Sequence, residues 1–163
     1  MKKYLDVMIG KHIKVDRGGP ESRSGLLLDV KEDFFTILTK EDGVVYYNLQ
    51  HIKSFTRDPK KDHEITATEL PETFSYFQGE TFKDVLAKLQ YTWLVINRGG
   101  PERVEGVLIS VDDTGISLVL KDEVVNVSDF HIRNISYGNN PFPTENEENE
   151  NSEDKNDKNK DKK

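Results

Sequence analysis

The chain has 163 residues and no cysteine, which excludes a disulfide framework and any metal site built from thiolates. Hydrophobic residues make up 34% and charged residues 33%, a balance that indicates small domains with much surface. The net charge is −7, with 10 basic and 9 acidic residues in 1–58, 6 and 9 in 80–137, and 5 and 8 from 144 onward. None of these segments is the strong cation that phosphate binding requires, so nucleic acid is not an expected partner.

The start of the chain does not resemble a secretory signal, because its apolar run is short and is interrupted by Asp6. A membrane span needs about twenty apolar residues, and the sequence has no such stretch. We therefore expect synthesis and residence on the cytosolic side of a membrane, without membrane insertion.

The pentapeptide Arg-Gly-Gly-Pro-Glu occurs twice, at 17–21 and again 81 residues later at 98–102. His51-Ile52 recurs 80 residues later as His131-Ile132, so the two copies stay in register with the loss of one residue. Such agreement indicates a duplicated module. The predicted organisation is a first repeat at 1–58, a linker at 59–80, a second repeat at 81–138 and an acidic, asparagine-rich tail at 139–163.

The first repeat is predicted to form a short helix followed by five strands. Leu5, Met8 and Ile9 follow a weak helical spacing, and a period of two begins at Ile13. The Asp-Gly pair at 42–43 favours a hairpin turn. The strands are expected near 13–15, from 25, and near 35–37, 45–47 and 53–55.

The linker carries three aromatic residues, Phe74, Tyr76 and Phe77, just before the second repeat. One interpretation is that these rings cover the open end of a barrel, as hydrophobic clusters under long connections do. The alternative is an exposed patch that contacts a partner.

The second repeat follows the same plan with a clearer helix. The run Thr81 to Asp84 has the form of a capping box, and four apolar residues follow at helical spacing: Phe82, Val85, Leu86 and Leu89. The strands are expected near 94–96, from 106, and near 116–118, 125–127 and 133–135.

Five short strands are too few for a sandwich of two full sheets, whereas a sheet closed on itself shelters its edges. The predicted fold is therefore mainly β, with two tandem small Sm- or SH3-like β-barrels, each preceded by a short helix. The barrel type is an analogy. The tail has no apolar residue from 144 onward and is predicted to be disordered.

The charged ends of the repeated loop are the candidate site. Glycine and proline account for a rigid reversal between strands, but a solvent-facing turn makes no demand for charges. Three interpretations stay open: an Arg–Glu pair that braces the loop, a protein-recognition surface presented twice, or an anion held by backbone amides. The predicted protein-interaction residues are Arg17, Gly18, Gly19, Pro20, Glu21, Arg98, Gly99, Gly100, Pro101 and Glu102.

The first strand differs between the repeats. Where the first repeat has His12 and Lys14, the second has Trp93 and Val95, which alternation places on the outer face. An apolar outer face must pack on something, so Trp93 is a predicted apolar contact for another protein.

No catalytic, metal or cofactor site is predicted. His51 and His131 occupy equivalent positions without a cluster of other ligands, which favours a structural role. The sequence has neither a Gly-x-Ser-x-Gly motif nor a phosphate loop of the Walker type, and its acids lie mostly on turns. The protein is expected not to be an enzyme. For a hydrolase, no set of three catalytic residues can be named from the sequence.

Several runs resemble the CotB-type outer spore coat proteins of endospore-forming bacteria. In the first repeat these runs are 10–22, 43–48 and 51–54, and in the second they are 96–102 and 130–136. The resemblance implies a structural protein made in the mother-cell cytoplasm and assembled on the forespore through contacts with itself and other coat proteins. Family members can carry a long phosphorylated tail rich in Ser, Lys and Arg. Here Ser152 is the only serine from 144 onward, so heavy phosphorylation is not carried over.

Two functions follow as hypotheses. The first is a coat component that uses its two repeats as linked contact points, since two modest interfaces on one chain reinforce each other. The alternative is an Sm-like RNA-binding module, against which the acidic balance argues.

Overall fold

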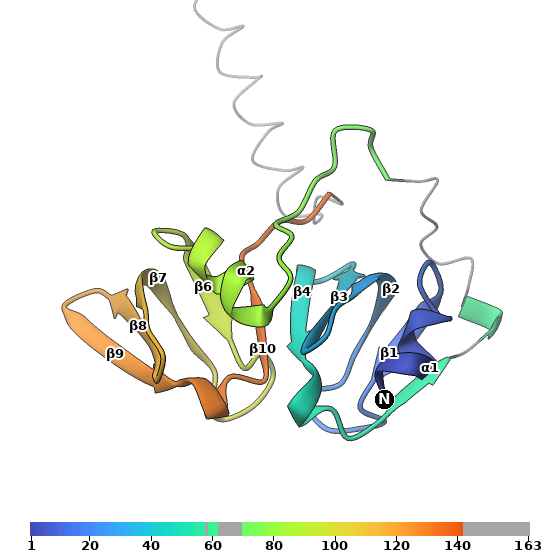
Figure 1. The fold of residues 1–163 in the computed structure, drawn as a ribbon, viewed down its shortest axis with the longest axis horizontal. Helices are drawn as coiled ribbons and strands as arrows, with labels where there is room; N and C mark the ends of the chain where they lie inside the picture. The colour runs from blue at the N-terminus through green and yellow to red at the C-terminus, as the bar shows by residue number, and fades with distance from the viewer. Residues whose placement is uncertain (58, 62–69, 142–163) are drawn as a thin grey trace, which may run out of the picture.

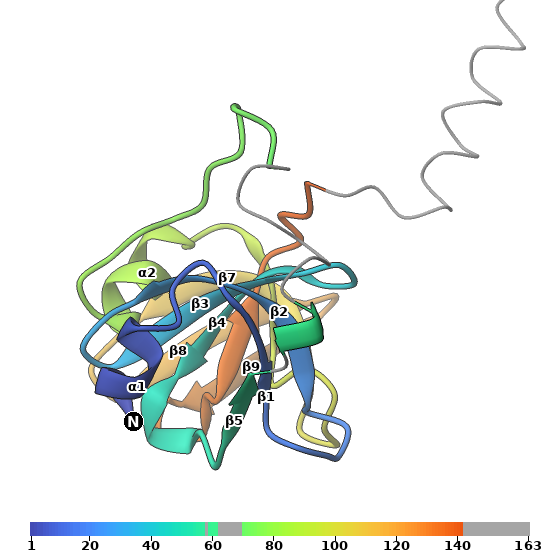
Figure 2. The ribbon, with the colours of Figure 1, turned by 90° about the vertical axis from the view of Figure 1, so that its right-hand side faces the viewer.

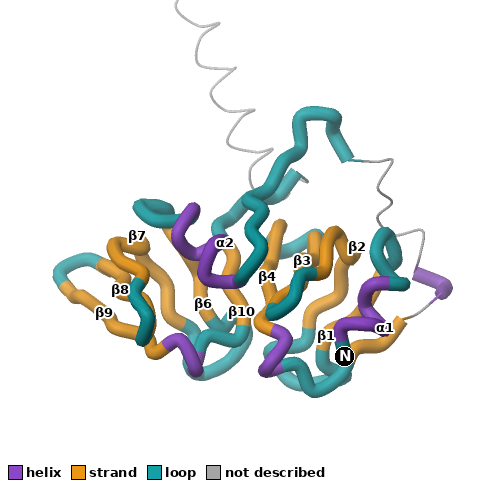
Figure 3. The backbone as a smooth tube through the Cα atoms, viewed as in Figure 1, coloured by secondary structure: helices purple, strands orange, loops and turns teal. Residues whose placement is uncertain are grey.

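The computed structural model describes residues 1–57, 59–61 and 70–141 (Figure 1). Strands dominate this part of the chain, as Figure 3 shows, so the mainly β prediction is confirmed. The first repeat contains α1 (Lys2–Asp6), β1 (His12–Val15), β2 (Arg23–Val30), β3 (Phe34–Thr39), β4 (Gly43–Asn48), η1 (Leu49–His51) and β5 (Phe55–Arg57), with η2 (Pro59–Lys61) after it. The second contains α2 (Phe82–Lys88), β6 (Trp93–Ile96), β7 (Val104–Val111), β8 (Gly115–Leu120), β9 (Glu123–Ser128), η4 (Asp129–His131) and β10 (Asn134–Ser136).

The ten strands of the described residues form one antiparallel sheet in the order β5-β1-β2-β3-β4-β10-β6-β7-β8-β9. Each repeat supplies five neighbouring strands in the same internal order. The registers also agree, because Phe55 pairs with Val15 in the first repeat and the equivalent Ile135 pairs with Ile96 in the second. The two repeats therefore share the same strand order and register as well as the same sequence motifs.

The pairing closes neither repeat into a barrel among the described strands. The outer edge of β4 is occupied by β10 of the second repeat and not by β5 of its own repeat. The expected pair of closed barrels is thus replaced by one continuous, unclosed sheet. Its end strands, β5 and β9, lie far apart: β9 is at one end of the molecule in Figure 1, and Figure 2 looks onto the opposite end, with β1, β5 and α1.

Two hydrophobic clusters hold this sheet together. One lies within the first repeat and combines Leu5 of α1 with inward residues of its strands, such as Ile37 and Val45. The other spans both repeats: it joins the opposite face of β2–β4 to α2 and to the interior of the second repeat. The rings of Phe34 and Phe82 lie 6.1 Å apart across this shared cluster. The second helix therefore packs between the repeats.

The structure confirms the capping box that begins α2. The Thr81 hydroxyl accepts a hydrogen bond from the Asp84 backbone N–H at 3.1 Å, and the Asp84 carboxylate accepts one from the Thr81 N–H at 2.9 Å. The hydrogen bond that the carboxylate accepts from the Thr81 backbone lowers the pKa of Asp84. The first helix is shorter than expected, because α1 ends at Asp6 and leaves Met8 and Ile9 beyond it.

The aromatic linker covers the shared cluster. Phe74 and Tyr76 pack against it, and the Tyr46 hydroxyl donates a 2.7 Å hydrogen bond to the Phe77 carbonyl oxygen. Burial of the Tyr46 ring raises the pKa of its hydroxyl. Phe77 itself stays 40% exposed. Two of the three rings, Phe74 and Tyr76, therefore cover a hydrophobic surface as predicted. That surface is the cluster shared by the two repeats and not the open end of one barrel.

The predicted outer face of the first strand needs a correction. His12 and Val95 are buried, whereas Lys14 and Trp93 on the same strands are exposed, so the outer face of each strand is covered over part of its length. Trp93 is 47% exposed, as expected of an outer-face residue, and its contact with another protein stays a prediction. Beyond β10, Asn139 accepts a 3.0 Å hydrogen bond from Val44 N–H, so this segment packs on the first repeat. The predicted tail otherwise lies outside the described residues.

Candidate interaction site at the junction of the repeats

The structure places the two Arg-Gly-Gly-Pro-Glu loops against each other. Arg133, which follows η4, lies between them: its Nη2 is 2.5 Å from Glu21 Oε1 and 3.0 Å from Glu102 Oε2. A methyl group added at Gly99 would overlap the carbonyl oxygen of Pro20. The loops therefore meet in one contact between the repeats, and neither is braced by an Arg–Glu pair of its own.

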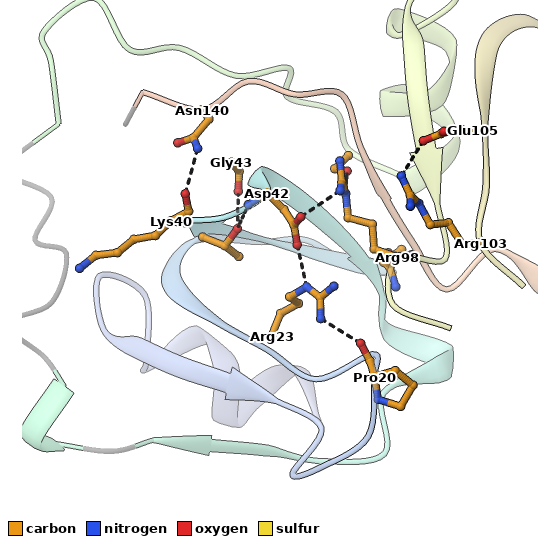
Figure 4. Close-up of polar contacts among 12 residues, drawn as sticks. Pro20, Arg23, Lys40, Asp42, Gly43, Arg98, Arg103, Glu105 and Asn140 are labelled. Atoms are coloured by element: carbon orange, nitrogen blue, oxygen red, sulfur yellow. Dashed lines mark hydrogen bonds and ion pairs between the residues drawn. The ribbon is translucent and has the colours of Figure 1, made fainter. Parts of the chain in front are cut away.

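Asp42 is the second link between the repeats (Figure 4). Its Oδ2 lies 2.6 Å from Arg23 Nε in its own repeat, and its Oδ1 lies 2.9 Å from Arg98 Nη1 in the other. The Thr39 hydroxyl accepts a hydrogen bond from the Asp42 N–H at 2.9 Å and fixes the hairpin turn. With 11% of its side chain exposed, this carboxylate is shared by two guanidinium groups in a partly buried position.

The side chain of Arg98 is less exposed than that of a charged loop residue usually is: 19% of it is accessible. Burial lowers the pKa of its guanidinium, although Asp42 opposes the shift. The Arg98 Nε also contacts the Ser136 hydroxyl on β10. Charged hydrogen bonds of this kind are stronger than neutral ones, so Arg98 holds the second loop to both β10 and the first repeat.

Identical loop sequences adopt different backbones in the two repeats. The positive φ falls at Gly19 in the first loop, with φ +90°, and at Gly99 in the second, with φ +87°. Gly99 corresponds to Gly18 by sequence, so the turn has moved by one position. The surroundings differ as well: a Cβ at Gly99 would meet Pro20 of the other repeat, whereas one at Gly18 or Gly19 would meet nothing within 4 Å.

The predicted interaction residues thus divide into two groups. The part-buried positions lie in the junction. Pro20 and Glu102 are exposed but also take part in it, through the contact with Gly99 and the ion pair with Arg133. The part-buried group is Glu21, Arg98, Gly99 and Gly100, and the exposed group is Arg17, Gly18, Gly19, Pro20, Pro101 and Glu102.

Sequence reasoning did not single out Asp42, Arg23 or Arg133. In the sequence, Asp42 stands out only as part of a turn, and Arg133 belongs only to the run 130–136. Nothing in their local sequence separates a buried ion pair from a solvated charge, so no sequence signal was available.

The histidines lie beside this junction and contact an aromatic ring. The rings of His51 and His131 lie 5.4 and 5.3 Å from that of Phe130. Within the described residues, no group of three or more histidines and acids is placed to hold a metal ion. No helix among those residues is both long and apolar enough to cross a bilayer.

The described residues thus define a duplicated β protein whose prominent polar site is a contact between its own repeats. No protein-family model matches the chain. The chain is 36% identical to spore coat protein B of Bacillus subtilis (strain 168) over 131 residues. The aligned region makes up 80% of this chain and 33% of the relative. This similarity confirms the CotB-type resemblance. The chain spans about a third of the length of the curated relative it matches.

Proposed function

We propose that this chain is a structural, non-enzymatic component of the spore coat that assembles through its two repeats. The observation that carries the proposal is the similarity to spore coat protein B, which extends over 80% of the chain. The relative's name supports the coat as the location. Contacts with other coat proteins and with copies of this chain are part of the same proposal.

The fold suits such a role because its two repeats form one extended sheet in which each repeat supplies one end strand. We take each repeat as a small unit that curves in the manner of an Sm- or SH3-like barrel, and the pair as the assembling element. Two linked contact points allow a layer to extend and raise the effective concentration of the second contact.

RNA binding is the weaker alternative. Phosphate recognition needs available cationic groups. Near the loops, Arg23 and Arg98 contact Asp42, and Arg133 contacts Glu21 and Glu102, so three guanidinium groups are already paired.

The test is the position of a fluorescent fusion of the full chain during sporulation of an endospore-forming host. We expect synthesis in the mother-cell cytoplasm, followed by a ring of fluorescence around the forespore. The fluorescent protein alone, expressed from the same promoter, is the control and stays diffuse. A fusion that also stays diffuse through spore maturation would refute the proposal.

A further inference from the structure

The two ends of the sheet are strands with an unpaired outer edge among the described strands. β9 occupies the same place in the second repeat that β4 occupies in the first, but the residues of β4 are all buried and those of β9 are exposed or half-buried. At the other end, β5 is mostly exposed, whereas the equivalent β10 is buried. Open strand edges present rows of backbone donors and acceptors to another chain.

The internal contact between β4 and β10 supplies a template for pairing these ends. Ile135 of β10 lies opposite Tyr46 of β4. The equivalent residues are Phe55 on β5 and Asn126 on β9. Applied to two molecules, the same relation places β5 of one copy beside β9 of the next.

The apolar surfaces at the two ends also match the template. In the internal contact, α2 packs over a face of the first repeat that includes Val44. The equivalent of α2 is α1, and the counterparts of the buried Phe82 and Val85 are Met1 and Tyr4, which are 50% and 70% exposed. The equivalent of Val44 is Val124, which is 59% exposed. Both halves of a second apolar contact are therefore present and uncovered.

The charges of the internal contact recur with the same signs. Arg98 and Asp42 correspond to Arg17 and Asp122, which are both exposed. Likewise, Arg133 and Glu21 correspond to Lys53 and Glu102, which are also exposed, although Glu102 is already paired with Arg133 of its own repeat.

We propose that copies of this chain join head to tail, the β9 edge of one molecule pairing with the β5 edge of the next. The partner is thus a second copy of this chain. Such a contact uses two different surfaces, so it propagates and does not stop at a dimer; it gives rings when the rotation closes and filaments when it does not. The inference deepens the proposed function and rests on it for its biological setting.

A charge exchange on the full chain tests the proposal by light scattering after size exclusion. We expect the unsubstituted protein to form species larger than a dimer as its concentration rises. Arg17→Asp and Asp122→Arg should each weaken assembly at least tenfold, and a chain that carries both changes should regain it. Glu72→Arg, an equal charge reversal at an exposed linker residue, is the matched control and should assemble normally.

A backbone change separates head-to-tail pairing from a symmetric dimer. Val44 and Asn48 donate their N–H groups to Asn139 and Arg133, so the N–H of Tyr46 between them also faces β10. By equivalence the Asn126 N–H faces outward from β9. Proline tolerates such an edge position but lacks the donor, so Asn126→Pro should block the β9 end and keep the fold.

Mixing then gives the decisive result. The Asn126→Pro chain keeps an intact β5 end, and the Arg17→Asp chain keeps an intact β9 end. At the lowest concentration at which the unsubstituted protein assembles, each variant alone should be monomeric, and an equal mixture should form dimers that contain one of each. Dimers formed by the Arg17→Asp chain alone, or an unsubstituted protein that stays monomeric at every soluble concentration, would overturn the proposal.

These results are separable from the test of coat function. Loss of assembly in solution together with a normal ring around the forespore would overturn head-to-tail pairing and leave the coat function in place. Assembly in solution with a diffuse fusion would support head-to-tail pairing and refute the coat function.

Discussion

Gly99→Ala is expected to lower the free energy of unfolding by about 3 kcal/mol, the largest effect of any single methyl group in the loops. Two costs add. A side chain at φ +87° costs about 1–2 kcal/mol, and the new methyl group overlaps the backbone carbonyl of Pro20, which cannot move aside as a flexible side chain can. Relief of the overlap requires the two repeats to separate at this point. Urea unfolding of the purified chain measures the loss.

Gly19→Ala is the matched control for this prediction. Gly19 has nearly the same positive φ, +90°, but a methyl group there would meet nothing within 4 Å. We therefore expect only the conformational cost, about 1 kcal/mol. Equal losses from the two substitutions would show that the loops do not touch.

Asp42→Asn is expected to lower the free energy of unfolding by about 2 kcal/mol. The amide keeps the size of the side chain but removes the charge shared by Arg23 and Arg98. Both guanidinium groups would then lie partly buried without their counter-charge. Breaking a fully buried ion pair costs more, and the residual exposure of these groups reduces the penalty.

The equivalent substitution in the second repeat is Asp122→Asn. Asp122 lies in the corresponding turn but is exposed, so its replacement should change stability by no more than about 0.5 kcal/mol. Both proteins should be unfolded at low concentration, so that self-association does not contribute. A loss at Asp122 as large as that at Asp42 would contradict the assignment of Asp42 to the junction.

Much of the fold could be predicted because its signals are local. The repeated pentapeptide and the spaced His-Ile pairs identified the duplication, and alternation located the strands to within a few residues. The Thr81–Asp84 pattern gave a capping box that the structure contains, because a cap depends on residues three positions apart.

The candidate site could be predicted only in part. The loops were identified, but the three interpretations of their charges assumed an isolated turn. In the structure Arg98 pairs with Asp42, 56 positions away, and Glu21 pairs with Arg133. Ion pairs across such separations leave no periodic or motif signal, because each partner alone looks like a solvated surface charge.

The sequence by itself determined that the protein is a duplicated, mainly β chain with the same strand plan in each copy. Tertiary structure decided what each copy buries. Val44-Val45 and Val124-Val125 are the same dipeptide at equivalent positions, yet Val44 is fully buried and Val124 is 59% exposed. The reason is that β10 and α2 can cover only one of the two equivalent edges within a single chain, and the covered edge belongs to the first repeat.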